Sequence, residues 1–338
     1  MGRDISYHIQ TSLFDYSKVF LPVQALRDIG IENVLNVESI FESANIEVDT
    51  NDLSKEINFV EETEGIKTPA EIKKVGDKYQ ICISLTFCQY MWAVGLYMSA
   101  YFDNMVQIPN MDRAGTNIYG YKADYRQVEF ATDSFMKGRL LIYGYNHDKF
   151  FSIPNICEPQ EFREPIEKAN GIMIGGLAFM FCHELAHNVL GHTHIEATYE
   201  ESIANEVAAD EYAISLIENT FEGENGYTNM VGAATVLCAL LLMREDCISG
   251  GSTHPHMDYR IDWLMKKMNL PEMDILWGYV GSAIRMWLLV FGGLTIEDDM
   301  KADGFSFYKD FYDHYLGILT EVRKERYPKV VKPMWYVD

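Results

Sequence analysis

The sequence is short of positive charge. Its 28 lysines and arginines stand against 50 aspartates and glutamates, so the formal net charge at pH 7 is −22. Such a chain repels phosphate backbones and anionic membrane surfaces unless basic residues gather in one place, and no basic patch stands out. We therefore expect no nucleic-acid partner. The length of 338 residues and the 48% hydrophobic content allow a sizeable core, which excludes wholesale disorder.

Closely spaced cysteines are absent. The six cysteines lie scattered in apolar runs, with no CxxC pair, and this argues against a disulfide framework. Reduced core thiols are typical of proteins in the cytoplasm. The first residues, MGRDIS, lack the cationic and then apolar profile of a secretory signal. We expect a cytoplasmic protein.

Long apolar runs are few. Residues 276–294 form one, but it contains Arg285, and an arginine at the centre of a bilayer costs about 2.5 to 3.5 kcal/mol. Residues 172–181 form another, which leads directly into the charged sequence HELAH. Both runs are predicted to be buried helices of a soluble protein, with no membrane partner.

The first half of the chain is mixed in character. Residues 41–65 carry eight acidic residues and one base, which predicts a solvated segment. Residues 78–85 alternate and are rich in isoleucine, which predicts a strand, and the spacing in residues 86–105 predicts a buried helix. Residues 106–160 mix Gly, Asn, Pro and Tyr with strand-like pieces such as LLIYGY at 140–145. We expect an irregular α+β N-terminal lobe over residues 1–160.

The second half, residues 161–338, reads as helical. A long helix is predicted with Pro165 in its first turn and Gly191 just beyond its end, and another from Thr198 to about Glu218, opened by the capping-box spacing of Thr198 and Glu201. A Gly/Asn loop at 223–229, a helix at 231–243 and two or three C-terminal helices follow. The fold class is therefore α+β, with the helices concentrated in the second half.

The sequence HELAH at residues 183–187 predicts a metal site. Residues i and i+4 of a helix differ by roughly 40° in direction, so His183 and His187 lie on one face, where both can reach one Zn²⁺. Glu184 lies about 100° from His183, at the rim of that face. There it can act as a general base that takes a proton from the attacking water without binding the metal.

The next helix supplies further carboxylates. A catalytic zinc has three protein ligands and one open position, and Glu206, 19 residues after His187, is the natural third ligand. Asp210 follows one turn later and can accept a hydrogen bond from the nitrogen of His183 that does not bind zinc. Four suitable residues on two successive helices make a chance match improbable.

Two other histidines compete for the third position. The pattern HExxHxxGxxH requires Gly and His at offsets 7 and 10 from the first histidine, where this chain has Leu190 and Thr193. The pattern therefore fails by one residue, and we interpret His192 and His194 as loop residues or as residues that support the ligands.

A third motif is THPHMDYRI at residues 253–261. By itself it is weak, because proline is common in the first turn of a helix and arginine is common at surfaces. After a zinc motif, His254 becomes the candidate that stabilises the oxyanion of a tetrahedral intermediate. Arg260 could hold the motif in place by a bidentate pair with a carboxylate.

Together HELAH, EVAAD and THPHMDYRI resemble the gluzincin zinc metallopeptidases, in which HExxH and a downstream ExxxD form the zinc site. THPxxxxRI is also similar to a segment of the membrane-embedded CAAX prenyl endopeptidases. A closer resemblance is to the Lit phage-exclusion peptidase family, and it extends discontinuously from Lys78 to Trp263. It implies a thermolysin-like catalytic half and a cytoplasmic zinc endopeptidase that cleaves elongation factor Tu during phage infection, with a phage-derived activator as a possible partner.

Two alternatives stay open at this level. One is a regulatory metallopeptidase that cleaves a repressor, although such proteins usually carry a DNA-binding module. The other is a catalytically silent zinc-binding interaction protein, against which the intact Glu184 argues, since a structural zinc site needs no base. For the endopeptidase, we expect an extended segment of a folded protein, elongation factor Tu if the resemblance holds, to add to an edge strand of the N-terminal lobe, supplied by LLIYGY or ICISL.

Overall fold

The structure is a computed structural model, and it describes residues 58–60, 62, 64–76, 78–144, 153–154, 161–194, 197–220, 223–250, 254–295, 305 and 307–328. Within these residues the chain is mostly helical and has one small sheet. This confirms the α+β class with a predominance of helix. The acidic segment predicted at 41–65 lies largely outside the described residues.

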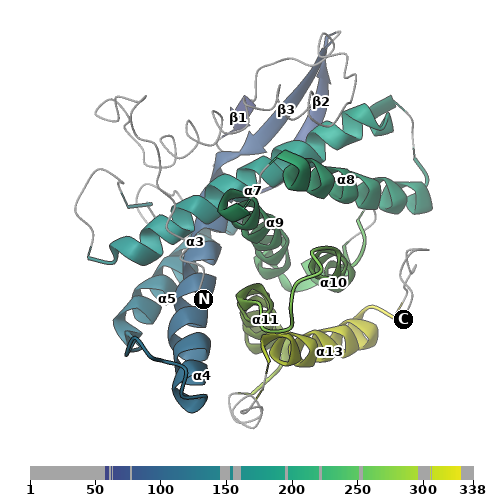
Figure 1. Ribbon diagram of the computed structural model, residues 1–338. Coiled ribbons are helices and arrows are strands. Elements are labelled where there is room, and N and C mark those ends of the chain that lie inside the picture. The colour runs from purple at the N-terminus through teal and green to yellow at the C-terminus, as the bar shows by residue number, and fades with distance from the viewer. Residues whose placement is uncertain are drawn as a thin grey trace. The chain divides into compact units, whose positions relative to one another are not determined.

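The elements follow one another along the chain as labelled in Figure 1. The strands are β1 (Asn58–Val60), β2 (Ala70–Val75) and β3 (Lys78–Ser84). The α-helices are α3 (Leu85–Tyr101), α4 (Ile108–Arg113), α5 (Tyr125–Leu140), α7 (Arg163–Val189), α8 (Tyr199–Thr220), α9 (Gly223–Met243), α10 (Met257–Lys267), α11 (Ile275–Trp287) and α13 (Tyr308–Arg326). Short 3₁₀ or π segments lie at Phe102–Gln107, Leu141–Tyr143, His192–His194, Glu245–Ser249 and Leu288–Gly292.

The sheet has the order β1-β3-β2 (Figure 1). Strand β3 pairs in parallel with β1, where Cys82 lies opposite Asn58, and antiparallel with β2, where Ile81 lies opposite Ile72. The predicted strand at 78–85 is therefore confirmed, but it is the central strand. Since both of its sides are paired, ICISL cannot be the free edge that was predicted to receive substrate.

The second predicted edge is also wrong. Residues of LLIYGY end helix α5 at Leu140 and continue as a 3₁₀ turn at Leu141–Tyr143. Leu141 and Ile142 are buried, and Gly144 ends the turn with φ +80°. The apolar side chains of this segment are thus buried at the end of a helix. The pattern of so few residues does not distinguish a strand from a helical turn. Among the described strands, the sheet edges are β1 and β2.

The helices of the second half begin and end largely as their local sequence dictates. Helix α7 has Pro165 in its first turn, and Gly191 follows its end with φ +77°. Helix α8 begins with a capping box, since the backbone N–H of Thr198 donates to Glu201 (2.8 Å) and that of Glu201 donates to Thr198 Oγ1 (3.3 Å). The loop predicted at 223–229 is wrong, because α9 already begins at Gly223.

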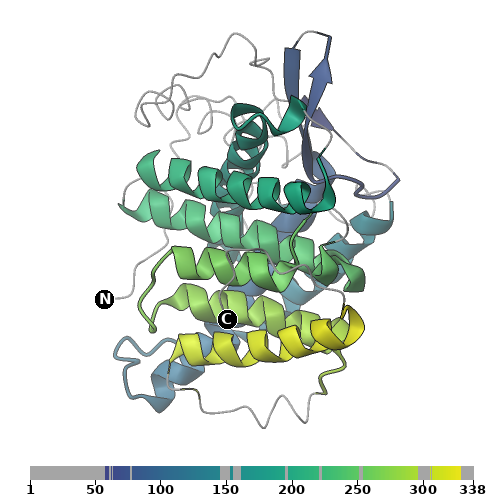
Figure 2. The ribbon, with the colours of Figure 1, turned by 90° about the vertical axis from the view of Figure 1, so that its right-hand side faces the viewer.

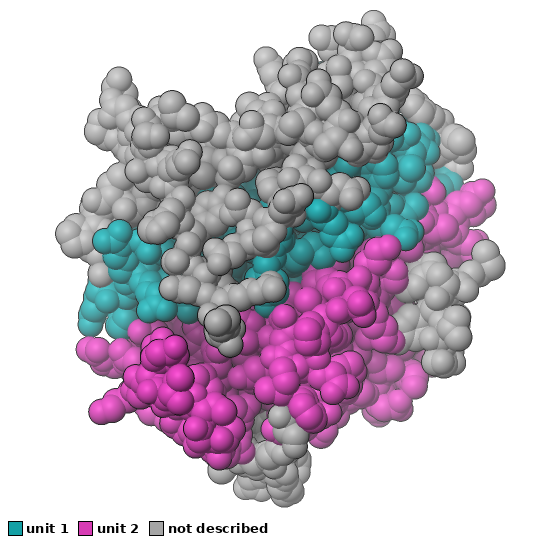
Figure 3. Space-filling view, viewed as in Figure 1, with its two compact units in different colours: residues 1–96, 132–197, 208–236 teal, residues 97–131, 198–207, 237–338 magenta. Residues whose placement is uncertain are grey.

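The chain divides into two compact units (Figure 3), one comprising residues 1–96, 132–197 and 208–236, and the other residues 97–131, 198–207 and 237–338. Both units are discontinuous in sequence. The predicted division at residue 160 stays a prediction.

The first unit is built around α7 and the buried part of α3. Helix α7 packs against β2 and β3. The indole N–H of Trp92 on α3 donates to the side-chain oxygen of Asn170 on α7 at 2.7 Å, and both side chains are buried. Helix α9 approaches α7 closely, because a Cβ atom on Gly232 would meet the backbone of Gly175 and Gly176. These contacts place the HELAH turn of α7 on a rigid support.

In the second unit, α13 packs along α11 (Figures 1 and 2). Its core includes the fully buried side chains of Trp287, Tyr312 and Leu319. Asp274 caps the start of α11, because its side chain accepts from the backbone N–H of Leu276 at 2.9 Å. Within the described residues, α11 and α13 follow the THPHMDYRI segment and α10, where the sequence predicted two or three helices.

Three described stretches are long and apolar enough to cross a membrane by length and composition: Arg163–Val189, Gly226–Met243 and Ile275–Gly292. The share of the most apolar window that is buried inside the protein is 89%, 78% and 67%, respectively. The absence of a membrane partner and the cytoplasmic location stay predictions.

Candidate metal centre

Two histidine side chains of α7 converge on one point. His183 Nε2 and His187 Nε2 lie 3.2 Å apart, with the rings edge to face at a centroid distance of 4.9 Å. The i, i+4 spacing brings the two side chains to one face of the helix. Two imidazole nitrogens that face a common point from the same side are suited to bind one metal ion.

Asp210 orients the first of these histidines. Its Oδ1 lies 2.9 Å from His183 Nδ1, and the Asp210 side chain is only 3% exposed. A carboxylate at Nδ1 holds the proton on that nitrogen, so that Nε2 keeps its lone pair for a metal. The structure therefore places Asp210 beside His183, the histidine for which the sequence predicted this contact.

Glu206 lies one helical turn before Asp210. Helix α8 is continuous from Tyr199 to Thr220, so the helix itself places Glu206 relative to Asp210. One ligand atom each from His183, His187 and Glu206 lie within 4.8 Å of one another. These residues form a group that could hold a metal ion. Two nitrogens and one carboxylate oxygen are a donor set that zinc uses in catalytic sites.

Glu184 follows His183 on α7 and is buried, with 8% of its surface exposed. A carboxyl group at this depth is shielded from bulk water, which suits a general base. Its assignment as that base stays a prediction.

A further histidine contacts the second candidate ligand, His187. His192, in the 3₁₀ turn after α7, places Nδ1 at 3.1 Å from His187 Nδ1. The sequence left His192 as a loop or supporting residue, and the structure brings it to the side of His187 that faces away from His183. One of the two nitrogens must donate and the other accept. The His194 side chain lies outside the described residues.

His254 approaches the group from another segment. Its Nε2 lies 3.2 Å from Glu206 Oε2, and 44% of its side chain is exposed. The contact places His254 against the carboxylate of the third candidate ligand, and its role toward an oxyanion stays a prediction. Arg260 lies on α10 and is 5% exposed; it is thus directed into the protein, and its carboxylate partner stays a prediction.

The arrangement could perform three chemical functions. The convergent nitrogens and the Glu206 oxygen can hold a cation, Asp210 and His192 can fix the orientation of the two histidines, and Glu184 can transfer protons beside them. Such a combination serves hydrolysis assisted by a metal.

The site lies in a part of the chain that matches a known protein family. A model of the family described as Peptidase U49 matches residues 81–280, which include every candidate residue of this site. No curated protein and no solved structure matches the chain. The matched region covers more than half of the sequence, and so the chain belongs to the peptidase U49 family and is a peptidase of the Lit-like kind.

Proposed function

We propose that this peptidase is a zinc-dependent endopeptidase of the gluzincin class, with a thermolysin-like catalytic half. The observation that carries the proposal is that one ligand atom each from His183, His187 and Glu206 lie within 4.8 Å of one another, with the two histidine Nε2 atoms 3.2 Å apart. Glu184 adjoins this group in the sequence. Three protein ligands leave one coordination position open, as in catalytic zinc sites, whereas structural zinc sites have four protein ligands.

The residues of the chain have separate roles in hydrolysis. A bound zinc would supply a Lewis acid for the scissile carbonyl and the attacking water. Glu184 accepts one proton from that water while the oxygen adds to the carbonyl carbon, and it then delivers the proton to the amide nitrogen as the C–N bond breaks. Asp210 holds His183 in one tautomer throughout.

The metal assignment is tested on the purified protein. We expect about one zinc per chain by elemental analysis, loss of cleavage after chelation, and recovery when zinc is added. His187→Ala should lose the zinc, while His314→Ala, a substitution of an exposed histidine on α13, should keep it. Full cleavage by protein stripped of metal would overturn the proposal.

We further propose that the substrate is elongation factor Tu, cleaved in the cytoplasm when a phage-derived activator is present. The proposal follows from the resemblance of HELAH, EVAAD and THPHMDYRI to the Lit phage-exclusion family. Cleavage of a folded protein requires an extended segment, and the sheet edges β1 and β2 are the places where such a segment can add a strand.

Incubation of the protein with elongation factor Tu, with and without a lysate of phage-infected cells, tests the substrate. A discrete fragment that forms with wild-type protein and not with Glu184→Gln supports the proposal. Cleavage of other proteins alone would favour the regulatory peptidase. Zinc binding without cleavage of any protein would favour the interaction protein.

A further inference from the structure

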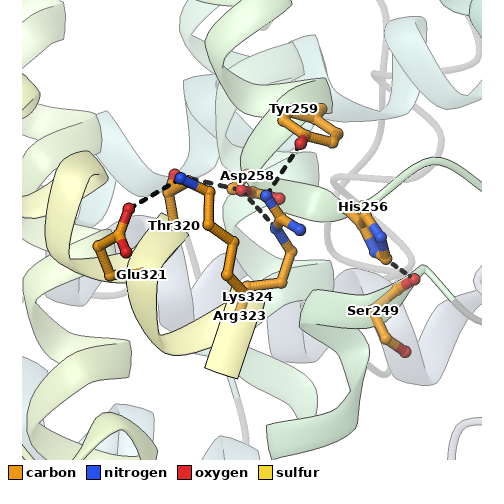
Figure 4. A network of polar contacts seen from close by, with 8 residues as sticks. All are labelled: Ser249, His256, Asp258, Tyr259, Thr320, Glu321, Arg323 and Lys324. Atoms are coloured by element: carbon orange, nitrogen blue, oxygen red, sulfur yellow. Dashed lines mark hydrogen bonds and ion pairs between the residues drawn. The ribbon is translucent and has the colours of Figure 1, made fainter. Parts of the chain in front are cut away.

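The C-terminal helix α13 reaches the THPHMDYRI segment through a buried arginine (Figure 4). Arg323 Nε donates to Asp258 Oδ2 at 2.7 Å, and the two side chains are 0% and 1% exposed. Arg323 Nη2 donates to the hydroxyl of Tyr259 at 2.9 Å, and Thr320 Oγ1 donates to Asp258 Oδ2 at 3.2 Å. The cluster joins residues that are 62 to 65 positions apart in the sequence.

A charge pair at this depth needs an explanation. Taking both charges out of water is costly, and apolar residues of similar volume often give equal or greater stability. A buried charge pair instead fixes the relative position of the two segments that it joins, because hydrogen bonds between charged groups depend on geometry more strongly than apolar packing does. The pair therefore specifies where the first turn of α10, which contains Asp258, lies relative to α13.

That first turn is joined to His254 by a compact connection. His256 precedes α10, and its Nδ1 lies 2.7 Å from the backbone oxygen of Ser249 (Figure 4). The backbone N–H of His254 donates to the oxygen of Gly250 at 3.3 Å. Gly250 has φ +67°, and a Cβ atom there would collide with the backbone oxygens of His254 and Pro255. The backbone of His254 thus has little freedom to move independently of α10.

The side chain of His254 contacts one of the candidate metal ligands, Glu206. Its Nε2 lies 3.2 Å from Glu206 Oε2. A group that contacts a ligand in this way sets the direction and basicity of that ligand.

We propose that Arg323 is a positioning residue of the metal centre: by holding Asp258, it holds His254 against the Glu206 carboxylate. The inference rests on the proposed function and deepens it. It gives α13 a role in positioning the metal centre, although this helix lies beyond the family match at residues 81–280.

The test compares zinc affinity, measured by competition with a chelator, among full-length variants. Arg323→Met should weaken zinc binding by about 10- to 100-fold, the range for residues that support metal ligands. Arg323→Lys should recover part of this loss. Tyr312→Phe is the matched control, because it removes the 3.5 Å contact of Tyr312 with Asp262 between the same two helices and leaves Asp258 intact; it should change zinc affinity by less than twofold.

Two further variants separate positioning from stability. The double variant Arg323→Met with Asp258→Leu replaces the pair by apolar residues, so it should fold while zinc affinity stays weak. In a His254→Ala background, Arg323→Met should weaken zinc binding no further, because the residue through which it acts is gone. Equal losses with and without His254, or wild-type affinity in the folded double variant, would overturn the proposal.

A readout independent of zinc distinguishes the failure of this inference from the failure of the proposed function. In metal-free protein, Arg323→Met should accelerate backbone hydrogen exchange at residues 254–258 more than Tyr312→Phe does. If wild-type protein binds no zinc, the zinc proposal fails, while the exchange experiment still decides whether Arg323 orders the His254 segment. Unchanged exchange at 254–258 would contradict the inference whether or not zinc binds.

Discussion

At the scale of single residues, the centre depends on pairs in which one side chain orients another. Asp210 contacts His183, His192 contacts His187, and His254 contacts Glu206. Each candidate ligand thus contacts a side chain that can orient it. Because the metal affinity of such sites depends on these partners as well as on the ligands, substitutions in the two sets should have different consequences.

Replacement of the proposed base should separate binding from catalysis. Glu184→Gln keeps the size of the side chain but cannot accept a proton, so cleavage should fall by at least about 10²-fold while zinc content stays at the wild-type level. Elemental analysis and a cleavage assay on the same preparation measure both. Near-normal cleavage by this variant would exclude Glu184 as the base.

Replacement of the supporting histidine should affect binding instead. His192→Ala removes the 3.1 Å contact with His187 Nδ1, and zinc affinity should fall by about 10- to 100-fold. Chelator competition measures the change, with the exposed His314→Ala as the control. Complete loss of zinc would mean that His192 is itself a ligand.

His254 has two possible effects that kinetics can distinguish. If it stabilises an oxyanion, His254→Ala should lower kcat by about 10²- to 10³-fold with KM little changed, since that interaction exists mainly in the transition state. If it only supports Glu206, the loss should be recovered at saturating zinc. Steady-state assays at low and high zinc give the answer.

At the scale of helices, the approach of α9 to α7 keeps the HELAH helix in place. A Cβ atom on Gly232 would lie 2.7 Å from Gly175 Cα and would also meet other backbone atoms of α7. Backbone cannot move aside as a flexible side chain can, so the two helices would have to separate.

Gly232→Ala should therefore lower the free energy of unfolding by about 1 to 3 kcal/mol, the usual cost of overpacking. Gly317→Ala on α13 is the matched control, because apart from its chain neighbours and its own helix backbone no described atom lies within 4 Å of a Cβ atom there, and alanine should stabilise that helix by about 0.4 to 1 kcal/mol. Chemical denaturation of both variants measures the difference. A stabilising effect of Gly232→Ala would contradict the close approach.

At the scale of the whole molecule, the cluster around Arg323 links stability to pH through His256. Burial, and secondly the Arg323 cation, hold the pKa of His256 below its ordinary value of 6.5, although Asp258 acts in the opposite direction. The folded protein then binds fewer protons at this site than the unfolded chain does. The stabilising contribution is complete above pH 6.5 and is lost as the pH falls toward the lowered pKa.

We therefore expect the free energy of unfolding to decrease between pH 7.5 and 5.5, and to decrease less in His256→Gln. Glutamine can still donate to the Ser249 oxygen but does not titrate, so carboxylates that titrate in both proteins cancel in the comparison. Denaturant titrations at the two pH values measure the effect. An identical pH dependence in both proteins would exclude His256 as its source.

The sequence by itself determined the features that depend on neighbours in the chain. Helices α7 and α8 begin and end where Pro165, Gly191, Thr198 and Glu201 predict, because caps and turns act within a few residues. The common face of His183 and His187 follows from helix geometry alone. The family match confirmed the expected peptidase.

Only the tertiary structure decided the features that depend on distant partners. Strand β3 is central because β1 and β2 both pair with it, and α9 includes Gly223 despite a local sequence that favours a loop. The contacts of His254 with Glu206 and of Arg323 with Asp258 join residues far apart in the chain. No local periodicity records such pairings, because they form only when the packing of whole helices brings the side chains together and removes them from water.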